Sequence, residues 1–325
     1  MARVDFLNVK SGDCSIIESN SGHVTVIDVS CGNYSPGLQQ IREMVFAAER
    51  PGGNYGMCDK PTNPVDWLKQ KGISNIFRFI LTHPDMDHLD GLKNLFESLK
   101  VTNFWDSGVR RDKPEFDSSR RFKEEDWDYY QEIIDGKISG LKIVEPKAGE
   151  QGKFWNSDDN GGGGDYFSVA APDSKLVADA NSSGNSNDGS YVIVYRSSGG
   201  KFVFSGDAHD DTWEYILKNH ENMVKDAAVL IAPHHGRKSG RSYDFLDTVN
   251  PKFSLFGCAP SEHLAYSAWT NRNLDYRTNN QCGNVSFFPG KDFIDVYIEC
   301  ESYAKNCNSS TTQNNEGMWY LGRIQ

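Results

Sequence analysis

The sequence predicts an α/β protein in which two packed β-sheets are flanked by helices. Short runs of β-favouring residues fill both halves of the 325-residue chain, and helical patterns separate them. Several of these runs are followed closely by histidine or aspartate. Strands that recur with helices between them are typical of sheets packed face to face, with helices on the outer faces.

Three strands are predicted at the start of the chain. They cover Arg3 to Val9, Cys14 to Glu18 and His23 to Asp28, and Asn20-Ser21-Gly22 supplies the hairpin turn between the last two. No helical pattern interrupts these strands, so the chain is expected to begin with β-structure alone.

Helical spacing first appears at Leu38 to Ala48. A second helix is predicted from Asn63-Pro64 to Gly72, because proline is favoured at the first helical position and glycine just after the last. The apolar run Ile76 to Thr82 is too short for a helix and is predicted to be a strand, which the helix Leu89 to Leu99 follows.

The second half of the chain returns to strands after a less regular segment. A hairpin turn at 197–200 joins two of them. The predicted strands are Tyr166 to Ala170, Ser190 to Arg196, Lys201 to Ser205, Ala228 to Ala232, Phe253 to Phe256, Val285 to Phe288 and Phe293 to Glu299, with helices at Asp211 to Asn219 and Tyr243 to Val249.

Residues 106–165 are the least regular part of the chain, with a helix predicted only around Glu125 to Ile134. We interpret this segment as an insertion or lid within one domain of residues 1–299, since strand patterns resume in the same style after it. Residues 300–325 are expected to form a polar tail that is loosely ordered up to Met318.

Composition narrows the class of protein. Lysine and arginine number 34 against 45 aspartates and glutamates, and the net charge of −11 argues against a protein that coats nucleic acid by charge alone. No apolar run of about 18 residues occurs and no secretory-signal pattern opens the chain, so we expect a cytoplasmic protein without membrane segments. The seven cysteines contain no C-x-x-C pair and are expected to be reduced thiols.

The densest group of chemistry-bearing residues follows the strand at Ile76 to Thr82. His83, Asp85 and Asp87 alternate along the chain, so an extended turn would place them on one side, and His88 would join them where a helix begins. Imidazole and carboxylate groups are ligands of Zn²⁺ in sites that keep a position open for water. The alternative is a solvated polar turn that contains two histidines.

Two other strand ends carry candidate groups. Asp207 follows Gly206 and is interpreted either as a carboxylate that bridges two cations or as the N-cap of the next helix. His234 and His235 are adjacent and therefore point in different directions, so one is a candidate metal ligand and the other a candidate substrate contact or acid–base group.

Charged residues accompany these strand ends. Arg237, Lys238 and Arg241 follow His235 and would suit an anionic substrate such as a phosphoester, although a solvated basic turn explains them equally well. Asp28 ends an early strand, where it is either an acid that orients a ligand histidine or a turn former.

Taken in order, these segments resemble the metallo-β-lactamase superfamily. The resemblance rests on Asp28, on T-H-x-D-x-D-H-x-x-G at Thr82 to Gly91, on S-G-D at Ser205 to Asp207 and on H-H-G at His234 to Gly236. The opening F-L-N-V-K-S-G-D-C-S-I-I-E at Phe6 to Glu18 is similar to the branch that includes the soluble hydrolase domain of ComEC-type competence (DNA-uptake) proteins and phosphorylcholine esterases.

The resemblance implies an αββα sandwich with a cleft for two divalent metal ions. Zn²⁺ is the ion expected first, with Mn²⁺ or Mg²⁺ as alternatives because the first position is rich in oxygen. Asp28 would orient a ligand imidazole, and Asn187 lies where many relatives carry a further histidine. The implied ligands are His83 and Asp85 for the first ion, Asp87, His88 and His235 for the second, and Asp207 as the bridge.

The resemblance further implies a hydrolase that uses a metal-activated water. The cations after His235 favour a phosphodiesterase or nuclease. Asp87, His234 and His263 are the candidate catalytic groups, and Arg237 and Lys238 are the candidate substrate contacts.

Two alternatives to a phosphodiester hydrolase remain open in the sequence. One is a hydrolase of a small ester, lactone or amide, whose neutral pocket Trp105, Trp155 or Trp269 would line. The other is a non-catalytic metal-binding protein that binds a partner protein through residues 106–165.

Overall fold

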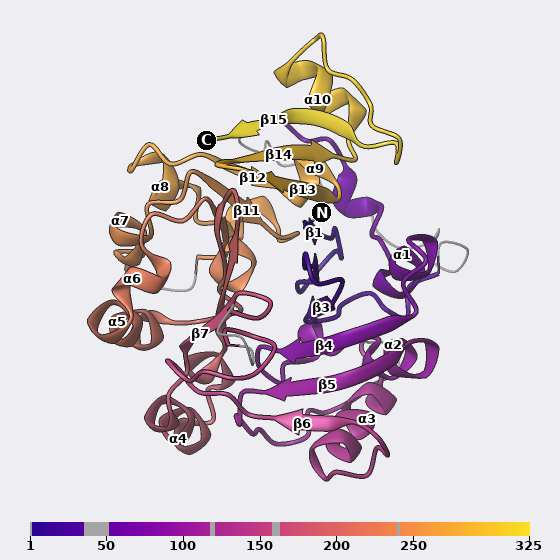
Figure 1. The fold of residues 1–325 in the computed structure, drawn as a ribbon, viewed down its shortest axis with the longest axis vertical. Helices are drawn as coiled ribbons and strands as arrows, with labels where there is room; N and C mark the ends of the chain where they lie inside the picture. The colour runs from indigo at the N-terminus through magenta and orange to yellow at the C-terminus, as the bar shows by residue number, and fades with distance from the viewer. Residues whose placement is uncertain (1, 36–51, 118–120, 158–162, 239–240) are drawn as a thin grey trace.

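The computed structural model describes residues 2–35, 52–117, 121–157, 163–238 and 241–325. Two β-sheets pack face to face in it, and helices cover both outer faces (Figure 1). The αββα architecture predicted from the sequence is therefore confirmed.

Within the described residues, the larger sheet has nine strands in the order β15-β14-β13-β1-β2-β3-β4-β5-β6. The strands from β3 to β6 run parallel to one another, and the other neighbours are antiparallel. The bounds are β1 Arg3–Phe6, β2 Ser15–Glu18, β3 Val24–Ile27, β4 Asn75–Leu81, β5 Lys100–Asp106, β6 Lys142–Val144, β13 Val285–Gly290, β14 Phe293–Ile298 and β15 Trp319–Ile324.

The smaller sheet has six strands in the described part of the chain, in the order β12-β11-β10-β9-β8-β7. The strands from β9 to β12 are parallel, and β7 and β8 complete the sheet in antiparallel fashion. The bounds are β7 Phe167–Ala171, β8 Val192–Ser197, β9 Gly200–Phe204, β10 Val229–Ile231, β11 Phe253–Phe256 and β12 Tyr276–Thr278.

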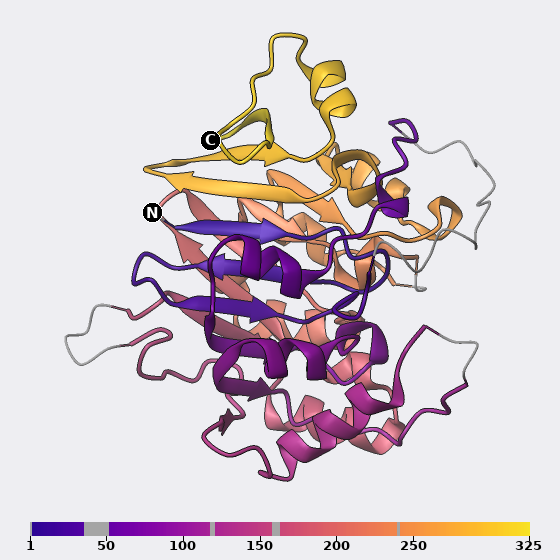
Figure 2. The ribbon, with the colours of Figure 1, turned by 90° about the vertical axis from the view of Figure 1, so that its right-hand side faces the viewer.

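Helices α1 to α3 cover the larger sheet and α4 to α8 the smaller one, as Figures 1 and 2 show. The α1 helix starts where its sequence predicts, because Asn63 accepts a hydrogen bond from the Val65 N–H and Pro64 occupies the first turn. The bounds are α1 Pro64–Gln70, α2 Leu92–Ser98, α3 Glu124–Ile134, α4 Ser174–Ser183, α5 Asp210–Asn219, α6 Glu221–Val224, α7 Phe245–Val249, α8 Tyr266–Thr270, α9 Asn279–Cys282 and α10 Glu301–Cys307.

The larger sheet is buried on both faces along β4. Phe79 packs among the residues beneath α1 to α3, whereas the next residue, Ile80, belongs to the core between the two sheets. This alternation explains why the run at 76–82 is mainly apolar; its one charged residue, Arg78, is buried and paired with Asp165. The predicted helix at Leu38 to Ala48 lies outside the described residues.

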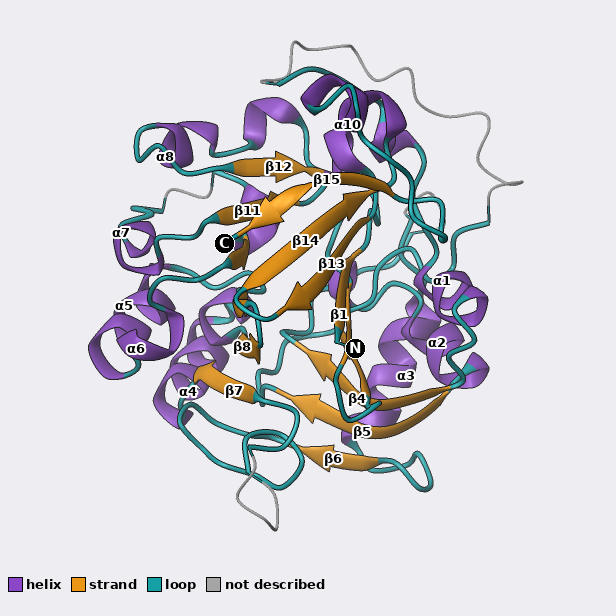
Figure 3. Ribbon diagram, turned by 45° about the horizontal axis from the view of Figure 1, so that its top comes forward, coloured by secondary structure: helices purple, strands orange, loops and turns teal. Residues whose placement is uncertain are grey.

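The segment 106–165, predicted as an insertion or lid, supplies α3 and the edge strand β6. One expectation about the irregular segments needs correction. The tail at 300–325 is not loosely ordered: it contains α10, and β15 pairs with β14 at the edge of the larger sheet (Figure 3). The sequence of β15 carries no clear alternation of apolar and polar residues, because most of its side chains are only partly covered.

The prediction of seven reduced cysteines was wrong for one pair. Cys58 and Cys258 form a disulfide that joins the loop before α1 to the segment after β11. The two cysteines are 200 residues apart, so their spacing carried no signal. Of the others, Cys307 is exposed, and Cys14, Cys31, Cys282 and Cys300 are buried.

Among the described helices, none combines the length and apolar character needed to cross a bilayer.

Candidate metal centre

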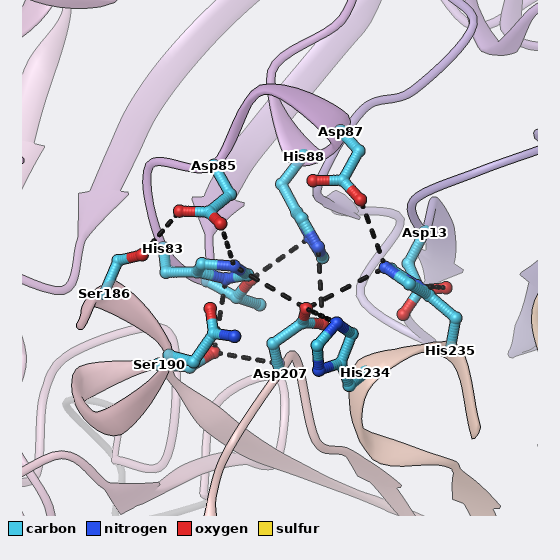
Figure 4. Close-up of polar contacts among 12 residues, drawn as sticks. Asp13, His83, Asp85, Asp87, His88, Ser186, Ser190, Asp207, His234 and His235 are labelled. Atoms are coloured by element: carbon cyan, nitrogen blue, oxygen red, sulfur yellow. Dashed lines mark hydrogen bonds and ion pairs between the residues drawn. The ribbon is translucent and has the colours of Figure 1, made fainter. Parts of the chain in front are cut away.

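The ends of strands from both sheets meet at one edge of the sandwich. The larger sheet supplies His83 directly after β4, and then Asp87 and His88 from the 3₁₀ turn η2 (Met86–His88). The smaller sheet supplies Asp207 after β9 and His235 from the 3₁₀ turn η4 (Pro233–Gly236) after β10. Figure 4 shows these side chains converging on one small region.

Asp207 lies at the centre of this group and is almost completely buried. One of its carboxylate oxygens lies 3.3 Å from Nε2 of His88, and the other lies 3.8 Å from Nε2 of His235 and 3.9 Å from Nε2 of His83. Oδ2 of Asp87 is 3.4 Å from Nε2 of His235. The structure thus brings five predicted ligands together, and their roles as ligands stay predictions.

Two carboxylates orient two of the predicted ligand histidines. Nδ1 of His88 lies 2.8 Å from Oδ2 of Asp28, and Nδ1 of His235 lies 2.9 Å from Oδ1 of Asp13. An ionised carboxylate only accepts hydrogen bonds, so each ring carries its proton on Nδ1. Nε2 of both rings therefore faces Asp207 and is the nitrogen that a metal ion would bind.

The same reasoning applies to His83. Its Nδ1 lies 3.0 Å from Oγ1 of Thr82, and that hydroxyl donates its proton to Asp28 at 2.8 Å. The hydroxyl must accept from His83, which leaves the lone pair of this ring on Nε2 as well. Asp28 consequently fixes two ligand rings, one directly and one through Thr82.

These tautomers leave several buried acceptors without a hydrogen bond. Nε2 of His83, His88 and His235 and Oδ1 of Asp207 have no hydrogen-bond partner in the described structure. Buried acceptors without partners are rare and destabilising, and divalent cations coordinate such atoms. Three sets of side chains have candidate ligand atoms that all lie within 4.8 Å of one another, close enough to share one metal ion. The sets are His83, His88 and Asp207; Asp87, His88 and His235; and Asp13, Asp207 and His235. The side chains therefore fit one or two divalent metal ions.

The electrostatics of the metal-free cluster also favour added positive charge. Burial alone would lower the pKa of His235, but the carboxylates of Asp13 and Asp207 raise it to about 10. Burial likewise opposes charge on His88, yet Asp28 and Asp207 raise its pKa well above the usual range. Without a metal ion, a second proton on Nε2 of each ring balances the carboxylates, and metal binding must release that proton to free the Nε2 lone pair.

His234 carries the opposite tautomer to His235. Nη2 of Arg241 lies 3.0 Å from Nδ1 of His234, and a guanidinium only donates, so Nδ1 accepts and the ring proton sits on Nε2. That Nε2 lies 3.7 Å from Oδ2 of Asp207. His234 is therefore placed beside the predicted ligands without a free lone pair on Nε2.

Arg241 is a buried cation beside this centre, with only 9% of its surface exposed. Nη2 also donates to the backbone oxygen of Asp207 at 2.9 Å. Nε and Nη1 are buried and have no hydrogen-bond partner in the described structure. A guanidinium in this state has unused donors for an anion.

Two glycines permit this close packing. Gly206 has a φ of +47°, and a Cβ there would lie 2.3 Å from Oγ of Ser190, so only glycine places Asp207 at the centre. Gly12 has a φ of +82°, and a Cβ there would lie 1.8 Å from the backbone oxygen of Asp87. Because Gly12 has no Cβ, the loop before β2 can approach closely enough for Asp13 to contact His235.

The remaining predicted site residues lie at the margin of the cluster or outside it. Asp85 stands at its margin, with Oδ2 3.9 Å from Nε2 of His83. Asn187 has a buried Oδ1 with no hydrogen-bond partner in the described structure, and its Nδ2 lies 3.5 Å from His209. Arg237 is half-buried and Lys238 is exposed.

The structure does not bring His263 to the ligands. Its side chain is exposed, and within the described residues its ring makes no hydrogen bond to them. The pocket expected from Trp105, Trp155 and Trp269 is also not formed, because all three side chains are buried in the cores.

Sequence reasoning missed two residues of this region. Asp13 follows a glycine in a loop, a pattern that ordinary turns share, so its role as the partner of His235 left no distinct signal. Arg111 bonds Asp85 from the irregular segment after β5, where no motif draws attention to it.

No model of a protein family matches the chain. The chain is 21% identical over 310 residues to ComE operon protein 3 of Bacillus subtilis (strain 168), and the match covers 90% of this chain but 35% of that protein. It therefore spans about a third of the length of this curated relative.

Solved structures that match include Igni18, a metallo hydrolase from the archaeon Ignicoccus hospitalis KIN4/I. It is 12% identical with a TM-score of 0.47, over 89% of this chain and 100% of that one. The metallo-β-lactamase fold protein YhfI from Bacillus subtilis is 10% identical with a TM-score of 0.44, over 85% and 96% of the two chains. The two mixed sheets, their flanking helices and the placement of the motifs at strand ends confirm the likeness to the metallo-β-lactamase fold that the sequence indicates.

Proposed function

We propose that this protein is a metal-dependent hydrolase that acts on phosphodiesters. The observation that carries the proposal is the set of buried, unpartnered Nε2 atoms of His83, His88 and His235 around Asp207. When bound, divalent ions would activate a water molecule and offset the charge that develops on the attacked group.

The chain's own residues prepare the site for this chemistry. Asp13 and Asp28 hold the histidine rings in the tautomer that presents Nε2. The Nε2–H of His234 is directed to the same region and can donate a hydrogen bond to the leaving oxygen of a substrate. This role differs from that of a metal ligand because its lone pair is engaged by Arg241.

The preference for a phosphodiester rests on the cations beside the centre. Arg241 has two unused donor nitrogens close to Asp207, and Arg237 and Lys238 come directly after the η4 turn that carries His235. The non-bridging oxygens of a phosphodiester accept such charge-assisted hydrogen bonds. A neutral ester would leave the Arg241 donors unsatisfied, and the buried tryptophans provide no aromatic pocket for it.

The test uses chelator-stripped protein reloaded with Mn²⁺ or Zn²⁺. We expect turnover of bis(p-nitrophenyl) phosphate, and of single- or double-stranded DNA if the site is wide enough, but not of p-nitrophenyl acetate. Asp207→Asn should abolish the turnover. Efficient ester hydrolysis with no phosphodiester turnover would overturn the proposal.

A variant of Arg241 tests the substrate class separately. Arg241→Gln should raise KM for the phosphodiester roughly 10- to 150-fold, since one charge-assisted hydrogen bond is worth roughly 1.5–3 kcal/mol. Lys137→Ala is the control, because Lys137 is exposed and pairs only with Asp135 among the described residues. Circular dichroism and thermal unfolding would show that both variants fold.

A further inference from the structure

Arg111 reaches the candidate metal centre from the segment after β5. Its Nη1 lies 2.5 Å from Oδ1 of Asp85, and Oγ of Ser186 donates to the same oxygen at 2.5 Å. Only Oδ2 of Asp85 faces His83, at 3.9 Å from Nε2 (Figure 4). One oxygen of this predicted ligand is therefore already bound to a cation.

The two predicted metal positions differ in their donors even without Arg111. The second position has two imidazoles and two carboxylates, from Asp87, His88, His235 and the shared Asp207. The first position, as the resemblance assigns it, has one imidazole, from His83, with Asp85 and the shared Asp207. His88 also lies within reach of His83 and Asp207, but the resemblance assigns it to the second position. Nitrogen donors and a complete set of ligands favour the second position for ions such as Zn²⁺.

We propose that Arg111 weakens metal binding at the first position, so that the second position fills first. The guanidinium and a metal ion would share the single carboxylate of Asp85, one on each oxygen. Like charges repel across so short a separation, and the carboxylate's charge is divided between them. This inference rests on the metal centre of the proposed function, not on its substrate.

A competing effect has the opposite sign. Arg111 and Ser186 also hold Asp85 in place, and an orienting partner of a metal ligand normally strengthens binding. The two effects separate in Arg111→Gln, which keeps a donor for Asp85 but removes the charge. If repulsion dominates, the first position tightens in this variant; if orientation dominates, it does not.

In the experiment, the chelator-stripped full chain is titrated with Mn²⁺ or Zn²⁺ alone. Calorimetry measures the binding steps, and equilibrium dialysis with elemental analysis measures the number of ions bound. The unmodified protein should bind two ions in two steps of unequal affinity. His83→Ala should remove the weaker step and so assign it to the first position. Arg111→Gln should tighten that weaker step tenfold or more and leave the stronger step unchanged.

Arg110→Gln is the matched control. Arg110 is the neighbouring arginine, and it pairs with Asp106 and Glu145 rather than with Asp85, so its loss should leave both steps unchanged. An unchanged or weakened step in Arg111→Gln, or two equal steps in the unmodified protein, would overturn the inference. Because metal stoichiometry is read directly, such a result leaves the proposed hydrolysis untouched, whereas absence of any metal binding would remove both.

Discussion

Replacing Asp13 by asparagine tests whether the carboxylate behind His235 supports metal binding. Oδ1 of Asp13 lies 2.9 Å from Nδ1 of His235, and the two residues are 5% and 1% exposed. The Asp13→Asn variant keeps an acceptor at that place but removes the charge. We expect weaker binding at the second position, because the ring loses the anionic partner that makes it a stronger donor.

The magnitude follows from the burial of the pair. Loss of an outer partner of a metal-bound histidine commonly lowers affinity 10–100-fold, which is about 1.4–2.7 kcal/mol. Solvent screens this contact very little, so the effect should lie toward the upper end of that range. A second readout is the pKa of His235 in the metal-free protein, which should fall because Asp13 is the main group that raises it.

The assay is competition for Zn²⁺ and Mn²⁺ with a chromophoric chelator. Asp126→Asn serves as the control: Asp126 is also fully buried, but it accepts hydrogen bonds from the N–H groups of Gly91 and Lys93 and from Asn33. Its replacement should leave metal affinity within about twofold of the unmodified protein. Equal affinities for Asp13→Asn and the unmodified protein would refute the reasoning.

Three further predictions concern stability and packing. In the metal-free protein, the raised pKa of His235 contributes stability that is complete below its usual value of 6.5 and is lost as pH rises through about 10. The midpoint of unfolding should therefore fall between these pH values in the presence of chelator but not with metal bound. Parallel pH profiles of the midpoint with and without metal would contradict this prediction. Replacing Cys58 and Cys258 by alanine should lower the free energy of unfolding by about 2–5 kcal/mol in urea titrations, since the disulfide links positions 200 residues apart. Cys307→Ala is the control, because Cys307 is an exposed free thiol. An equal loss of stability in the two variants would contradict the prediction. Gly206→Ala should weaken metal binding, because the added Cβ would lie 2.3 Å from Oγ of Ser190 and displace Asp207. Gly136→Ala is the control: Gly136 also has a positive φ, but a Cβ there would have no atom within 4 Å. Equal metal affinities of the two variants would show that the position of Asp207 does not depend on glycine at 206.

The strands were predictable where burial imposes a simple pattern. The runs that became β4, β9 and β11 are mainly apolar because both faces of these strands are largely covered, and their residue types favour a strand over a helix. The strands β6 and β15 lie at the two edges of the larger sheet, where side chains are partly exposed and such a pattern is absent. Edge strands depend on pairing with a distant partner, which a local reading of the sequence does not contain.

The convergence of the predicted ligand side chains was foreseeable for a different reason. His83, Asp87 and His88 sit within six residues at the end of one strand, so their convergence needs only local geometry. Asp207 and His235 follow strands of the other sheet, and parallel strands bring their carboxyl ends to one edge. What sequence could not supply were the partners of these ligands, because hydrogen bonds between loops of two sheets have no fixed spacing.

The adjacent histidines 234 and 235 show how such partners decide chemistry. Both residues adopt the left-handed backbone conformation, with φ of 53° and 58°, and both are imidazoles on one loop. Their roles differ because His235 donates to Asp13, 222 residues away, whereas His234 accepts from Arg241, seven residues away. A carboxylate behind one ring exposes a lone pair to the centre, and a guanidinium behind the other exposes a proton. The division between ligand and hydrogen-bond donor is thus set by charges that the fold places behind each ring, and exchanging those charges should exchange the roles.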